Sequence, residues 1–97
     1  MTDRRIVHLI IRGRVQGVGF RAFVEHEAIT RRLDGWVRNR RDSTVEAIAA
    51  GPREAVDSFI EALRQGPPAS RVEAVEALEA NESSFAERSG FSMLPTV

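Results

Sequence analysis

The sequence predicts a two-layer α+β fold in which one antiparallel sheet carries two helices on a single face. Short apolar runs with β-branched residues alternate along the chain with two segments of helical periodicity. Glycine and proline mark the boundaries between these segments. The chain has 97 residues, which suits one domain with one core and is too short for a two-halved dinucleotide-binding fold. We therefore expect a single domain over residues 1–97.

The first half of the chain predicts a strand, a helix and a hairpin. Residues 6–11 are apolar and β-branched, as in a buried strand. The apolar residues of the segment 20–33 recur at roughly helical spacing: Phe20, Phe23, Val24, Ala28 and Ile29. Residues 36–39 and 44–50 then read as two short strands, and they are close enough in sequence to pair as a hairpin.

A second helix is the clearest element of the second half. It starts at Gly51-Pro52, because proline is tolerated in a first helical turn, and it ends at Gly66-Pro67. Its apolar residues lie on one face: Ala55, Val56, Phe59, Ile60 and Leu63.

The segment 70–80 has two interpretations. As a helix, its larger apolar residues are three apart: Val72, Val75 and Leu78. As a strand, one face carries Val72, Ala74, Leu78 and Ala80, interrupted by Glu76. The local pattern favours the helix, since alanine and glutamate are good helix formers. A strand here would complete a split β-α-β pair, with a polar connection over 81–89 and a short edge strand over 91–94.

The loop between the first strand and the first helix indicates an anion-binding site. Residues 12–21 read Arg-Gly-Arg-Val-Gln-Gly-Val-Gly-Phe-Arg, so three glycines precede Arg21 at the helix start. The first amides of a helix have no intrahelical partner, and glycines let the preceding backbone approach a ligand closely. The planar guanidinium of arginine matches two phosphate oxygens at once. A plain turn with a solvated arginine would show the same pattern.

The amino-acid composition excludes several kinds of site and favours an anionic ligand. The chain has no cysteine, which excludes disulfides, thiolate nucleophiles and cysteine-ligated metals. Its net charge is zero, but residues 1–41 carry ten arginines and four acids, whereas residues 42–97 carry four arginines and ten acids. The basic half contains the glycine loop and would attract an anion there. No apolar run approaches the length of a membrane helix, so a soluble cytoplasmic protein is expected.

Two motifs resemble those of the acylphosphatases. They are Gly-Arg-Val-Gln-Gly-Val-Gly-Phe-Arg at 13–21, and Gly-Trp-Val-Arg-Asn at 35–39 followed by Thr-Val-Glu at 44–46. The resemblance covers about residues 6–75 and implies a ferredoxin-like βαββαβ sandwich, with a strand at 70–80. Two departures occur: Ser43 stands where many relatives have glycine, and Met93-Leu94-Pro95 replaces an apolar residue, arginine and an aromatic. The last strand is therefore expected to be short.

The resemblance also implies an activity, the hydrolysis of the carboxyl-phosphate bond of small acyl phosphates to a carboxylate and inorganic phosphate. In the family the arginine that closes the loop motif binds the phosphoryl group, here Arg21, and the asparagine of the second motif orients the attacking water, here Asn39. Backbone amides of the loop complete the phosphate site: Val15, Gln16, Gly17, Val18 and Gly19. The carboxylate leaving group has a conjugate-acid pKa of about 4, so neither a general acid, a metal nor a cofactor is needed.

Three other interpretations fit parts of the sequence. Residues 17–22 fit the dinucleotide fingerprint Gly-x-Gly-x-x-Ala, but the chain lacks room for a doubly wound sheet. RNA-binding domains of this topology stack bases on aromatic residues of their central strands, and residues 6–11 and 44–50 contain none. A phosphate-binding domain of a larger maturation enzyme would need further motifs. We therefore expect a complete chain that is a monomer, with a small acyl phosphate and no nucleic acid or membrane as partner.

Overall fold

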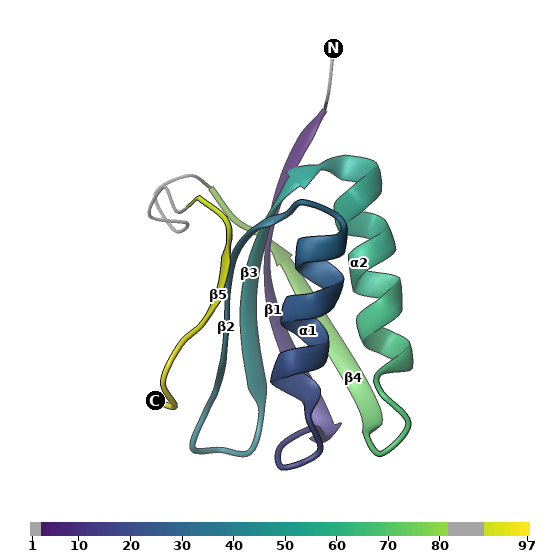
Figure 1. Cartoon of the computed structure of the whole chain (residues 1–97), viewed down its shortest axis with the longest axis vertical. Coiled ribbons are helices and arrows are strands. Elements are labelled where there is room, and N and C mark those ends of the chain that lie inside the picture. The colour runs from purple at the N-terminus through teal and green to yellow at the C-terminus, as the bar shows by residue number, and fades with distance from the viewer. Residues whose placement is uncertain (1–2, 82–88) are drawn as a thin grey trace.

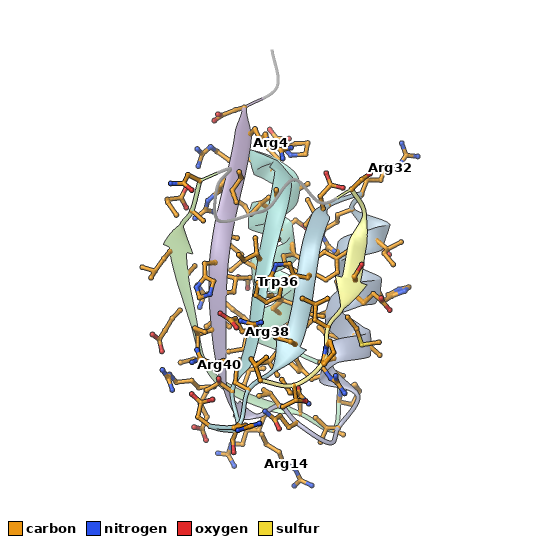
Figure 2. All side chains as sticks on the ribbon, turned by 90° about the vertical axis from the view of Figure 1, so that its left-hand side faces the viewer. Arg4, Arg14, Arg32, Trp36, Arg38 and Arg40 are labelled. Atoms are coloured by element: carbon orange, nitrogen blue, oxygen red, sulfur yellow. The ribbon has the colours of Figure 1, made fainter. Side chains whose placement is uncertain are left out.

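The computed structural model describes residues 3–81 and 89–97 as one sheet with two helices against it (Figure 1). The elements are β1 (Arg4–Arg14), α1 (Phe20–Thr30), β2 (Asp34–Asn39), β3 (Val45–Pro52), α2 (Arg53–Gln65), β4 (Arg71–Glu79) and β5 (Phe91–Met93). The order across the sheet is β4-β1-β3-β2-β5, and all neighbours are antiparallel except β2 and β5. Both helices cover the same face, and neither lies on the other face, here called the open face (Figures 1 and 2). The expected two-layer fold is confirmed.

The observed strands and helices differ from the expected ones mainly at their ends. β1 is longer than the apolar run at 6–11 because it lies inside the sheet and pairs with both β3 and β4. Hydrogen bonding on both sides therefore extends it into polar residues. α1 ends three residues earlier than expected, because the backbone turns at Arg32, which has φ 57°, and Leu33 N donates to Ala28 O at 2.9 Å. Neither helix among the described residues is long and apolar enough to cross a membrane.

The segment 70–80 forms β4, so the local preference for a helix is wrong. The register between β1 and β4 shifts: Arg12 pairs with Ala74, whereas Gly13 pairs with Val72, which leaves one extra residue on β4. Such a bulge reverses the alternation of side chains. Val72 and Val75 therefore both pack against the core although they are three residues apart. The spacing that suggested a helix is the spacing of a bulged strand.

The core lies between the sheet and the helices and fixes both ends of the glycine loop. Apolar residues of β1, β3 and α2 are buried in it: Val7, Leu9, Ile11, Val45, Ala47, Ala49, Val56, Phe59, Ile60 and Leu63. Val15, just after β1, and Phe20, the first residue of α1, are each 1% exposed. Because these two side chains are anchored in the core, the backbone between them has a defined position.

The open face of the sheet carries a polar cluster of its own. Glu46 accepts hydrogen bonds from Arg38 Nε at 2.7 Å and pairs with His8 Nε2 at 2.6 Å. Burial opposes ionisation of this carboxylate, but the hydrogen bonds to His8 and Arg38 outweigh burial and lower the pKa of Glu46. The guanidinium of Arg38 lies 4.6 Å from the centre of the Trp36 ring, and both side chains project from this face (Figure 2). The cluster joins β1, β2 and β3.

Beyond β5 the chain continues alongside β2. Leu94 N donates to Val37 O at 2.8 Å, and Val97 N donates to Asn39 O at 3.2 Å. Arg41 N in turn donates to Val97 O at 2.8 Å. β5 itself has three residues, as expected for a short edge strand. The expected polar connection over 81–89 falls largely on residues 82–88, which lie outside the described residues.

The turn between β2 and β3 is closed by main-chain hydrogen bonds. Arg40 N donates to Thr44 O at 2.9 Å, and Ser43 N donates to Arg40 O at 3.1 Å. Asp42 Oδ1 accepts from Thr44 Oγ1 and N at 2.6 and 3.0 Å, and these bonds lower the pKa of Asp42. Ser43 has φ 75°, a left-handed conformation that glycine adopts without steric cost. The serine is therefore accommodated in this turn with local strain.

Replacing Ser43 by glycine is expected to stabilise the protein. Glycine has no Cβ and so avoids the steric penalty of the left-handed conformation, but it loses more backbone entropy on folding. The net effect should be a free energy of unfolding that is higher by about 0.5–1 kcal/mol. Urea denaturation at constant pH measures this change. An unchanged or lower midpoint of urea denaturation in this variant would show that Ser43 is not strained. The control is Ser58→Gly in the middle of α2, which should be destabilising.

Candidate active site

The glycine loop, residues 15–19, presents unpaired main-chain N–H groups. Gly17 and Gly19 have φ of 73° and 77°, and Gly19 is also the residue that precedes α1. Its carbonyl accepts from Phe23 N at 3.1 Å, so the helix begins directly after the loop. Within the described residues, none of the five loop N–H groups donates a hydrogen bond. Consecutive free N–H groups at a helix N-terminus form a binding site for an anion.

A pocket of about 210 Å³ lies beside this loop, and three separate parts of the chain line it. The loop and α1 contribute one wall, the end of β2 a second, and β5 a third. The lining residues are Val15, Gly17, Gly19, Phe20, Arg21, Ala22, Asn39 and Met93. Arg21 is the sole charged residue among them, so the pocket is suited to a negatively charged ligand.

Arg21 and Asn39 both retain hydrogen-bonding capacity in this pocket. Among the residues that the structure describes, Arg21 has no ion-pair or side-chain hydrogen-bond partner. Asn39 Oδ1 is buried and accepts no hydrogen bond. A buried amide oxygen without a partner costs about 1–3 kcal/mol, and such a cost is typical of a functional group. The backbone of Asn39 is held by pairing with Val45 and by Val97.

The structure brings five of the seven predicted site residues to the pocket: Val15, Gly17, Gly19, Arg21 and Asn39. The other two, Gln16 and Val18, do not line it with their side chains. Val18 packs against the core, and Gln16 bonds to the β2–β3 turn. Within residues 3–81 and 89–97, no group of three or more histidines, cysteines or acids is arranged to hold a metal ion.

Three lining residues were not predicted from the sequence: Phe20, Ala22 and Met93. Phe20 and Ala22 flank Arg21 at the start of α1, so their proximity could have been inferred from the helix start. Met93 is different, because parallel pairing of β5 with β2 places it beside Val37, 56 residues earlier in the chain. No local pattern carries that information.

Comparison with known proteins gives a consistent result. A family model described as Acylphosphatase matches residues 7–93. An acylphosphatase of Bradyrhizobium diazoefficiens is 51% identical over 99 residues, covering 98% of this chain and 99% of that protein. The crystal structure of acylphosphatase from Bacillus subtilis has a TM-score of 0.86 and 44% identity, covering 92% of this chain and 97% of that one. Full-length HypF, in a phosphate- and nucleotide-bound form, has a TM-score of 0.87 and 26% identity, but only 12% of it is covered.

The fold and its pocket define a small hydrolase built as a ferredoxin-like sandwich. More particularly, the chain belongs to the acylphosphatase family, and its function is that of an acylphosphatase. The resemblance drawn from the two sequence motifs is thereby confirmed, and so is the strand that it implied at 70–80.

Proposed function

We propose that the pocket beside the glycine loop hydrolyses small acyl phosphates by positioning and charge stabilisation. The observation that carries this proposal is that Arg21, the glycine loop with its free N–H groups, and Asn39, whose Oδ1 is unpaired, line one pocket. The guanidinium and the N–H groups bind the phosphoryl oxygens, whose negative charge is greatest in the transition state. A volume of about 210 Å³ suits a phosphoryl group with a small acyl substituent.

Asn39 orients the attacking water in this mechanism. Its Oδ1 accepts a hydrogen bond from the water, and its amide nitrogen can donate to a phosphoryl oxygen. The water oxygen forms a new bond to phosphorus while the bond between phosphorus and the carboxyl oxygen breaks. The products are a carboxylate and inorganic phosphate, and one proton of the water passes to a phosphate oxygen or to bulk water. An amide is too weakly basic to take that proton itself.

The leaving group explains why so few side chains suffice. A carboxylate, whose conjugate acid has a pKa of about 4, departs without protonation, so no general acid is required. The charge on the equatorial oxygens is stabilised by Arg21 and the loop amides instead of a metal ion. We therefore propose a reaction that depends on neither a metal nor a cofactor.

A rate assay with purified protein tests this proposal. We expect hydrolysis of benzoyl phosphate without added metal, undiminished by EDTA, and competitive inhibition by inorganic phosphate, because phosphate is bound by the same donors. A buffer blank that contains EDTA but no protein corrects for spontaneous hydrolysis. Activity lost with EDTA and restored by a divalent cation would contradict the metal-free mechanism.

The same assay bears on the oligomeric state. We propose that the protein acts as a monomer in the cytoplasm on a small-molecule substrate, without a nucleic acid or membrane partner. The support is that one chain supplies every group named above. Specific activity should then stay constant on dilution, and activity that falls on dilution would indicate a functional oligomer. Cell fractionation tests the location.

A further inference from the structure

The side chain of Gln16 connects the glycine loop to the hairpin that carries Asn39. Gln16 Nε2 donates to the carbonyl oxygens of both Arg40 and Thr44 at 2.8 Å. These two residues flank the turn between β2 and β3, and Arg40 directly follows Asn39. In the described part of the chain, no other side-chain hydrogen bond joins residues 15–19 to this hairpin.

The chemistry of the contact suits an uncharged amide. Both partners are carbonyl oxygens and can only accept, and the single NH₂ group of Gln16 supplies a donor to each. A hydroxyl has one donor, and a carboxylate would place negative charge against two carbonyl oxygens. Glutamine is also long enough to reach from the loop to the hairpin, and its side chain is partly buried along that path. The orientation of the Gln16 amide is therefore set by its partners.

The hydrogen bonds within the turn fix its shape, whereas contacts with other segments fix its position against the loop. Ser43 holds it in a left-handed conformation, and the β2–β3 pairing ends at Asn39 and Val45. On the outer side, Val97 bonds to Asn39 and Arg41. On the side that faces the anion loop, the side chain of Gln16 holds the turn in place. The pairing of β3 with both β1 and β2 sets the strand backbones, Ile11 and Asn39 both opposite Val45, and Gln16 adds the side-chain link between the anion loop and the turn after Asn39.

We propose that Gln16 is a positioning residue for the hydrolysis. By fixing the hairpin against the loop, it aligns the water held by Asn39 with the phosphorus of a phosphoryl group held by the loop. The inference rests on the proposed role of Asn39. Alignment matters because displacement of a reacting group by about 1 Å can cost up to 10²-fold in rate. The side chain of Gln16 thus affects the position of the attacking water through Asn39. Its main-chain N–H has a separate role, as one of the donors to the phosphoryl group.

The test uses Gln16→Met, which keeps the length of the side chain and removes both donors. We expect kcat on benzoyl phosphate to fall about tenfold or more, with the inhibition constant of inorganic phosphate changed less than about threefold. Retained phosphate binding also shows that the variant is folded. The matched control is Ser70→Ala, which removes another bond from a side chain to a carbonyl, Ser70 Oγ to Pro67 O at 2.7 Å, in the turn before β4. It should leave kcat unchanged.

Several outcomes would overturn the inference. An unchanged kcat in Gln16→Met would show that the two bonds do not affect alignment. An inhibition constant that rises as much as kcat falls would show that Gln16 shapes the phosphate site instead. A lower melting temperature with an unchanged kcat, measured well below that temperature, would show that Gln16 has a structural role only.

A double variant distinguishes this inference from the proposed function. If Gln16 acts through Asn39, adding Gln16→Met to Asn39→Ala should cause little further loss of kcat, and a fully additive loss would contradict the coupling. Normal turnover in Asn39→Ala alone would overturn the proposed role of Asn39 and this inference with it. If kcat falls in Asn39→Ala but not in Gln16→Met, this inference is overturned and the proposed role of Asn39 stands.

Discussion

Replacing Asn39 by alanine is expected to lower kcat by about 10²–10³-fold, the usual effect of losing one positioned hydrogen-bonding group in an active site. Inorganic phosphate should still bind, because its donors on the loop and Arg21 remain. The substitution removes a buried polar atom that has no partner within the described protein, so the free energy of unfolding should not fall. Steady-state kinetics on benzoyl phosphate, with phosphate as inhibitor, measure both quantities.

Asn39→Asp provides the matched comparison. It keeps the shape of the side chain but places a carboxylate beside a bound dianion, so phosphate binding should weaken, unlike in Asn39→Ala. Turnover near that of the unmodified protein in the alanine variant would remove Asn39 from the mechanism. Equal phosphate affinity in the two variants would show that Asn39 is not adjacent to the bound phosphoryl group.

Replacing Arg21 by alanine is expected to weaken both phosphate binding and turnover. Arg21 is the charged residue in the pocket lining, so its loss leaves only uncharged donors to bind the phosphoryl group. We expect kcat/KM to fall by at least about 10²–10³-fold, with a higher inhibition constant for phosphate. Lysine at this position should restore part of the binding, because it keeps the charge but not the planar pair of donors.

Arg32→Ala is the control for the loss of one positive charge. Arg32 is exposed and lies at the opposite end of the sheet from Arg14, the last residue before the loop (Figure 2). Its removal should leave kcat/KM unchanged within about twofold, because separate surface charges interact weakly at physiological salt. Similar losses in the two variants would mean that Arg21 acts through the overall field and not through contact. Retention of phosphate affinity in Arg21→Ala would exclude it from the site.

The elements of this fold could be predicted from the sequence where the burial pattern is regular. The helix α2 and the strand β3, in which all residues but the last are buried, follow directly from their apolar residues. β4 could not be predicted locally, because its bulge gives Val72 and Val75 a helical spacing. The strand at 70–80 was predicted from the family resemblance and not from the local pattern.

The candidate site was predictable in part for a similar reason. The loop and Arg21 are contiguous in sequence and carry their own signal, and Asn39 followed from a second motif. Met93 reaches the pocket through parallel pairing across the sheet, and the contacts of Gln16 with the hairpin span 24 and 28 residues. Contacts of that kind depend on tertiary structure and leave no pattern in a single sequence.

The hydrogen bonds between the last residue and the hairpin have a practical consequence for handling the protein. Val97 bonds to both neighbours of Arg40, so a purification tag or reporter fused after it would start beside the main chain of Asn39. β1 starts beside Pro52, at the far end of the sheet (Figure 1). Expression vectors should therefore place any fusion partner ahead of Met1.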